Sequence, residues 1–133
     1  MMDLSKFLGD YSEEGHWRDD SGDSGELHGG ISILLDADQL QFSVDDGHRM
    51  IAQVSGDSSR PFQFEGFGGG ATSTGAVYIG EQSLILEYTA NVSGRHEQNV
   101  DVWTVNGQSF QRAGIIRQDG RTIWFEARMN RTS

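Results

Sequence analysis

The chain of 133 residues contains no cysteine, and this absence excludes two kinds of chemistry. No disulfide framework can hold the fold together, and no thiolate can act as a nucleophile or as a metal ligand. Proline is nearly absent too, with Pro61 as the single example, whereas glycine occurs 18 times. So many glycines in a chain with few helix formers indicate many short strands joined by turns.

Basic residues are scarce, and the formal net charge is −10. A chain this acidic repels phosphate backbones, so a nucleic-acid partner is not expected. The acidity is concentrated at the start, where residues 1–26 carry a net charge of −6, while residues 83–133 carry +1. No apolar run approaches the roughly 20 residues that span a membrane. No signal-peptide pattern opens the chain, and a cytoplasmic protein without a membrane partner is expected.

Apolar and polar residues alternate along most of the chain, which is the period of a β-strand. The alternation predicts ten strands, at residues 14–18, 27–35, 39–45, 48–54, 62–67, 72–79, 83–92, 96–105, 108–116 and 121–129. Glycine-containing turns separate several of them, namely Asp45-Asp46-Gly47, Gly68-Gly69-Gly70, Asn106-Gly107 and Gln118-Asp119-Gly120.

Short hairpins between antiparallel strands favour a fold that leaves no strand edge open. An up-and-down barrel achieves this by closing the sheet on itself. We therefore predict an all-β, single-domain barrel of about eight to ten strands over residues 1–133, with an N-terminal segment at 1–13.

Hairpin geometry predicts which side chains share a face of the last four strands. A two-residue Asn106-Gly107 turn, and three-residue loops at 93–95 and 118–120, align four charged residues side by side. This polar row consists of Glu87, Asp101, Arg112 and Glu126. The same registers place Trp103, Phe110 and Trp124 on the face of the polar row.

The opposite face of these strands is almost entirely apolar, so burial is expected to send it inward. The Trp103, Phe110 and Trp124 face then points outward, and an exposed aromatic patch indicates a subunit interface, here of a homodimer. Two alternatives stay open. The row is a solvated charge ladder, or the sheet is oriented the other way and the polar row lines a cavity. In the last case Glu87 or Asp101 would be the base and Arg112 the electrostatic stabiliser of a barrel isomerase, cyclase or lyase.

The stretch 19–26 contains the tetrapeptide Gly-Asp-Ser-Gly, which surrounds the nucleophilic serine of trypsin-like proteases. Here Glu26 and Leu27 follow instead of Gly-Pro, and the chain is too short for the two-barrel protease fold, so Ser24 is not expected to be a nucleophile. Asp19, Ser21 and Asp23 have the spacing of the first half of a calcium loop, but no glutamate closes it. We predict a flexible acidic loop at 19–26 on the barrel rim. The four histidines have no metal-ligand spacing, and no metal site is expected.

Gly15-His16-Trp17 near the start and Arg128 near the end resemble the pattern of the calycin family, which includes lipocalins, fatty-acid-binding proteins and avidins. In that family a Gly-x-Trp packs under a basic residue from the last strand. The resemblance implies that Trp17 plugs one end of the barrel and that Arg128, or Arg131, covers it. It also implies an eight- or ten-stranded barrel that holds a small apolar ligand. The stretch 123–131 has no histidine like the one that binds haem in similar ten-stranded barrels, so no cofactor is expected.

The predicted function is therefore non-catalytic binding of a small, largely apolar ligand inside the barrel. The candidate lining residues are the large apolar residues of the predicted strands, namely Phe42, Met50, Phe64, Tyr78, Tyr88 and Phe125.

Overall fold

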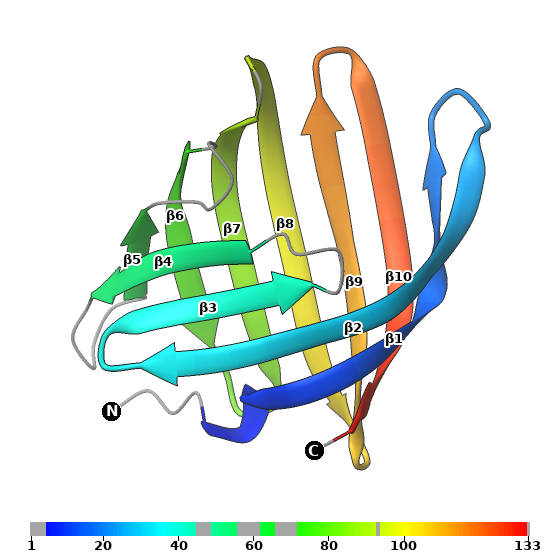
Figure 1. The fold of residues 1–133 in the computed structure, drawn as a ribbon. Helices are drawn as coiled ribbons and strands as arrows, with labels where there is room; N and C mark the ends of the chain where they lie inside the picture. Colours follow the sequence, from blue (N-terminus) through cyan, green and yellow to red (C-terminus); the bar gives the residue numbers. More distant parts are fainter. Residues whose placement is uncertain (1–4, 45–48, 56–61, 66–71, 93, 133) are drawn as a thin grey trace.

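A computed structural model describes residues 5–44, 49–55, 62–65, 72–92 and 94–132, and these residues form one short 3-10 helix and ten strands (Figure 1). The helix is η1 (Ser5–Phe7). The strands are β1 (Gly9–Asp19), β2 (Ser24–Asp36), β3 (Gln39–Val44), β4 (Arg49–Ser55), β5 (Phe62–Glu65), β6 (Thr72–Ile79), β7 (Ser83–Val92), β8 (Arg95–Asn106), β9 (Ser109–Gln118) and β10 (Arg121–Arg131).

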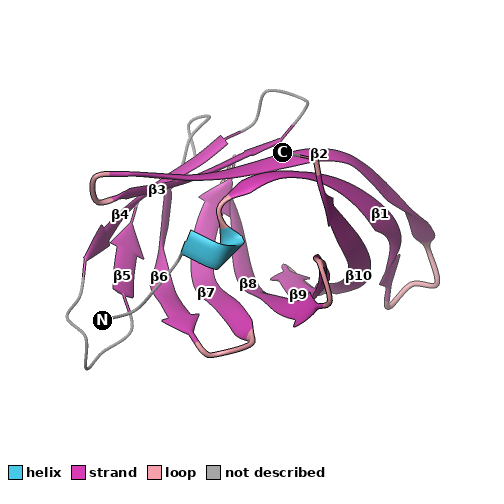
Figure 2. Ribbon diagram, turned by 90° about the horizontal axis from the view of Figure 1, so that it is seen from below, coloured by secondary structure: helices cyan, strands magenta, loops and turns pink. Residues whose placement is uncertain are grey.

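Each strand pairs antiparallel with its neighbours in the chain, and β1 pairs with β2 on one side and β10 on the other. The sheet is thus a closed barrel, and the predicted all-β, up-and-down fold is confirmed. Seen along its axis in Figure 2, η1 lies across one end of the barrel. We call this the helical end. The opposite end, where the β1–β2 and β9–β10 turns lie, is the hairpin end (Figure 1).

The helical end is filled by aromatic side chains, which close it. Phe7, Tyr11 and Trp103 are at most 2% exposed, and Phe110 is 5% exposed. The Tyr11 ring meets Trp103 edge-on at 5.5 Å and Phe110 at 5.6 Å between ring centroids, as aromatic quadrupoles prefer. The Tyr11 hydroxyl donates a 2.7 Å hydrogen bond to the Phe7 carbonyl, which ties β1 to η1.

Arg131, near the end of β10, stabilises the helical end by contacts with the backbone around η1 and with the Tyr11 ring. Its Nη1 and Nη2 donate hydrogen bonds to the carbonyls of Leu8 (2.5 Å) and Lys6 (2.8 Å). Its guanidinium also lies 5.0 Å from the centroid of the Tyr11 ring. One cation thus satisfies carbonyls that the short helix leaves open and covers an aromatic face.

The first hairpin differs from the sequence expectation. β1 begins at Gly9 rather than at residue 14, and β2 begins at Ser24, so only residues 20–23 connect them. Asp19 organises this turn, since its Oδ1 accepts hydrogen bonds from the Ser21 amide (3.0 Å), the Ser21 hydroxyl (2.7 Å) and the Asp23 amide (2.9 Å). Half of the predicted loop at 19–26 therefore belongs to the strands. The expected turns at 45–47 and 68–70 lie outside the described residues. In the part of the chain that is described, no helix is long and apolar enough to cross a membrane.

Candidate functional site

Two hairpin turns decide which side chains point into the barrel. The ladder of β7 and β8 pairs Val92 with Arg95, and that of β9 and β10 pairs Gln118 with Arg121. Each connection is one residue shorter than the predicted three-residue loop. A one-residue change of register moves a whole strand's side chains to the opposite face. The predicted alignment of the four charged residues is therefore wrong at both of these turns.

The polar row is split between the two faces of the sheet. Asp101 is 7% exposed and Arg112 is half-buried, and both lie on the inner face, whereas Glu87 and Glu126 are exposed on the outer face. The Asn106-Gly107 hairpin pairs Val105 with Phe110 instead of Gln108. This shift of two residues preserves the face, and Asp101 and Arg112 still meet.

The proposed aromatic interface is likewise wrong for two of its three members. Trp103 and Phe110 belong to the core at the helical end, and a buried side chain cannot form a subunit contact. Trp124 alone points outward, with 44% of its surface exposed. Its neighbour across the β9–β10 ladder is Ile115, which pairs in turn with Val100 of β8.

An ion cluster of Glu13, Asp101 and Arg112 lies inside the barrel. Arg112 Nη2 is 2.7 Å from Asp101 Oδ2, and Arg112 Nε is 3.0 Å from Asp101 Oδ1. Arg112 Nη1 is 2.5 Å from Glu13 Oε2, so the guanidinium of β9 reaches across β10 to β1. It can do so because Ala127, the β10 partner of Arg112, has only a methyl group. Two carboxylates thus share one cation, and the cluster has a formal charge of −1.

The cluster is partly enclosed, which makes its internal pairing strong. Arg112 has a side-chain exposure of 19%, and Glu13 and Asp101 each have 10%. Burial alone would lower the pKa of Arg112, but the charges and hydrogen bonds of Asp101 and Glu13 raise that pKa above its usual range. The guanidinium also lies 4.9 Å from the centroid of the Phe125 ring, so it is held on several sides. Arg112 donates hydrogen bonds to both oxygens of Asp101, so the guanidinium fixes the orientation of this carboxylate.

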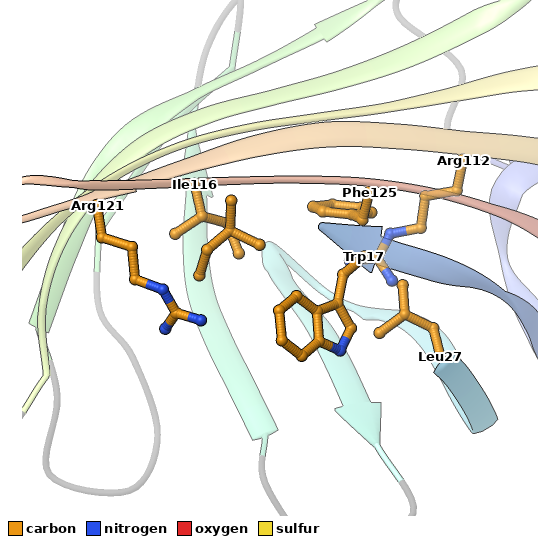
Figure 3. A pocket seen from close by; sticks show the side chains of 7 residues that line it. Trp17, Leu27, Arg112, Ile116, Arg121 and Phe125 are labelled. Atoms are coloured by element: carbon orange, nitrogen blue, oxygen red, sulfur yellow. The ribbon is translucent and has the colours of Figure 1, made fainter. Parts of the chain in front are cut away.

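A pocket of about 320 Å³ lies between this cluster and the hairpin end (Figure 3). Its apolar lining comes from β1, β2, β9 and β10, and consists of Trp17, Leu27, Ile116, Ile123 and Phe125. Arg112 and Arg121 complete the lining, and Figure 3 shows them at opposite ends of the group with Trp17 between them. All of these inward side chains are only half-buried, unlike the buried aromatic residues that fill the helical end. The barrel is therefore packed solid at the helical end and hollow toward the hairpin end.

Two glycines shape the aromatic walls of this pocket. The Trp17 ring lies over Gly25 of β2, where a Cβ would stand 2.5 Å from Trp17 Nε1. The Phe125 ring lies over Gly114 of β9, where a Cβ would stand 2.5 Å from Phe125 Cζ. Both rings occupy space that any side chain on the neighbouring strand would fill.

An ion pair marks the outer edge of the pocket. Arg121 Nε and Nη2 lie 2.9 and 2.8 Å from Asp19 Oδ2, and the guanidinium lies 5.8 Å from the centroid of a Trp17 ring. The Ser21 hydrogen bond, followed by Arg121 and the turn amides, lowers the pKa of Asp19 from 3.8 to about 2. The acidic turn and the pocket wall are therefore coupled through one carboxylate.

The predicted lining residues have different positions. Phe125 lines the pocket, while Tyr88 and Phe42 pack against the core. Burial, with the nearby charge of Asp101, raises the pKa of Tyr88 to about 12, so its phenol is neutral. Tyr78 is 39% exposed on the outer face and cannot line the interior, which corrects the prediction. The side chains of Met50 and Phe64 lie outside the described part of the structure.

The two residues expected to close the barrel, Trp17 and Arg128, do not contact each other in the way that was predicted. Trp17 lines the pocket instead of plugging an end, and Arg128 is exposed on the outer face, so it does not cover Trp17. The covering role belongs to Arg131, the alternative candidate, and the ring beneath it is Tyr11. Sequence reasoning missed Glu13, Leu27, Ile116, Arg121 and Ile123 as site residues. Glu13 shares the inward parity of Tyr11 and Trp17, but only the unpredicted start of β1 at Gly9 places it in a strand.

No protein-family model matches this chain, and a search of curated proteins finds no similar sequence. Among the described residues, no three histidine or acidic side chains are grouped as metal ligands. The site therefore has to be interpreted from its own geometry.

Proposed function

We propose that the protein binds a small, largely apolar molecule in the pocket between the ion cluster and the hairpin end. The observation that carries this proposal is the contrast along the barrel axis. Inward side chains are fully buried around Tyr11 and Trp103, but half-buried around Trp17 and Ile116. The volume of about 320 Å³ lies at the lower end of the range of roughly 300–1,000 Å³ of ligand pockets.

The lining supports a binding role in its chemistry as well. Five apolar side chains offer contact area to a hydrophobic body, and the two arginines are already paired with carboxylates of the chain. A site with apolar walls and few, fixed polar groups is typical of small-molecule recognition.

The test uses two neighbouring isoleucines of β9 that face opposite ways. Ile116 lines the pocket, whereas Ile115 lies on the outer face. We expect N-phenyl-1-naphthylamine, a neutral dye that fluoresces in apolar sites, to bind the parent protein. Ile116→Trp should weaken this binding roughly tenfold or more, the scale of a misfit in an apolar pocket. Ile115→Trp is the matched control and should leave the affinity unchanged.

Each variant is first checked for a cooperative thermal transition. A dye that does not bind, or one whose affinity is affected equally by both substitutions, would rule out the pocket as its site.

A further inference from the structure

Two buried nitrogen atoms on the inner face of β8 have no hydrogen-bond partner within the described residues. They are Asn99 Nδ2 and Trp103 Nε1. Asn99 is 6% exposed and Trp103 is 1% exposed. A buried donor without an acceptor is costly and uncommon in folded proteins. Asn99 in particular needs a physical explanation, because aliphatic side chains are available for such a position at no such cost.

Asn99 adjoins the pocket. It pairs across the β8–β9 ladder with Ile116, whose side chain lines the pocket, and it shares the inward parity of Asp101. Its side chain therefore lies directly beside the pocket, behind the wall that Ile116 forms, although Asn99 is not itself one of the lining residues. Trp103 lies farther toward the helical end, inside the aromatic core. Of the two donors, Asn99 is the nearer to the pocket.

The charges around the pocket disfavour an anionic ligand. Arg112 is already bound by Asp101 and Glu13, and this cluster carries a formal charge of −1. Arg121 is paired with Asp19 in the same way. A ligand carboxylate would have to displace one of these partners, in a protein whose net charge is already −10. A neutral hydrogen-bond acceptor meets no such opposition.

We infer that the pocket selects an apolar molecule bearing an uncharged acceptor, such as a ketone or amide carbonyl, which accepts a hydrogen bond from Asn99 Nδ2. This inference rests on the proposed function and specifies its ligand class. The apolar walls bind the body of the molecule, Asn99 fixes its carbonyl, and the surplus carboxylate of the ion cluster rejects acids of the same shape.

Three probes of nearly equal shape separate these contributions. They are 2-acetylnaphthalene, 2-ethylnaphthalene and 2-naphthoate, which present a carbonyl, an ethyl group and a carboxylate on one ring system. Affinity is measured by competition with N-phenyl-1-naphthylamine at pH 7. We expect the ketone to bind on the order of fivefold more tightly than the ethyl compound, the scale of one net hydrogen bond. The carboxylate should bind most weakly.

Asn99→Leu supplies the decisive comparison, because it keeps the size of the side chain and removes its donor. The ketone should then bind no better than the ethyl compound, whose own affinity should be unchanged and so shows that the pocket is intact. Gln98→Leu, on the exposed outer face of β8, is the matched control and should keep the ketone preference.

The outcomes distinguish the two proposals. If none of the probes binds, the proposed binding function is wrong for molecules of this size. If all bind but the carboxylate equals the ketone, or the ketone preference survives in Asn99→Leu, the pocket binds ligands and the inference about their acceptor is overturned.

Discussion

Removing Arg112 tests whether the ion cluster is a stabilising unit of the barrel. Arg112→Met keeps much of the aliphatic stem but leaves Glu13 and Asp101 without their cation, at side-chain exposures of 10% each. Breaking a buried ion pair by removing one partner costs about 3–5 kcal/mol, because a charge is left uncompensated. In a barrel of this size each kcal/mol corresponds to roughly 3–5 °C in melting temperature, so we expect a loss of at least about 10 °C.

The physical reason predicts a rescue. In the triple variant Glu13→Gln, Asp101→Asn and Arg112→Met, no buried charge is left unpaired. Most of the lost stability should return, less about 1–2 kcal/mol for the cation–π contact with Phe125 and related packing.

Urea unfolding at pH 7 and pH 4 measures both effects. At pH 4, protonation of Glu13 and Asp101 in Arg112→Met should reduce the stability difference between this variant and the parent protein. A single variant that loses less than about 1 kcal/mol, or a triple variant as unstable as the single one, would refute the reasoning that uncompensated charge dominates.

Three further predictions concern the ends and walls of the barrel. Arg131→Gln should lower the free energy of unfolding by about 1–2 kcal/mol and speed amide hydrogen exchange in the N-terminal turn, because two backbone carbonyls and the Tyr11 ring lose their contacts with the guanidinium. Unchanged exchange in that turn would contradict this. Asp19→Asn should be less stable than the parent at pH 6 and equally stable only below pH 2. The pKa of Asp19 is lowered from 3.8 to about 2, so its ionised form stabilises the fold above pH 4, and this stabilisation is lost as the pH falls through 2. A difference in melting temperature that stays undiminished below pH 2 would count against it. Gly114→Ala should lower the stability of the fold by about 2 kcal/mol or more, because the new methyl group would stand 2.5 Å from the Phe125 ring. A melting curve by circular dichroism that matches the parent would show that the pocket wall accommodates the methyl group without cost.

The architecture could be predicted from the sequence because it depends on a repeated local signal. Alternation of apolar and polar residues recurs in nearly every strand, and the glycine-containing turns separate them. Closure followed from the general cost of open strand edges, and the β1–β10 pairing confirms it.

The faces of the last strands could not be predicted with the same security, because each depends on a single residue at a turn. Gly94 and Gly120 adopt positive φ angles of 79° and 72°, and each closes its hairpin one residue more tightly than expected. These two changes of register put Glu87 and Glu126 on the opposite face of the sheet from Asp101 and Arg112. Asp101 and Arg112 still form an ion pair because the register between β8 and β9 differs from the predicted one by two residues, and a shift of two keeps both side chains on one face.

Glu13 was invisible to sequence reasoning for a different reason. It meets Arg112 across 99 positions of the chain, and only the closed barrel brings them together. An acidic residue within an acidic N-terminal region has no local feature that distinguishes an interior ligand of an arginine from a solvated charge.

The pairing of the first strand with the last also determines the order in which this barrel can assemble. Tyr11 lies opposite Arg131, 120 positions farther along the chain, whereas every other ladder joins strands adjacent in sequence. The meander from β1 to β10 can form from local hairpins, but ring closure carries the largest loop-closure entropy and is expected late in folding. Until then two strand edges stay open, one on each side of the half-formed pocket. Substitutions that weaken the seam between β1 and β10 should therefore raise the tendency to aggregate during refolding well before they lower the stability of the finished barrel.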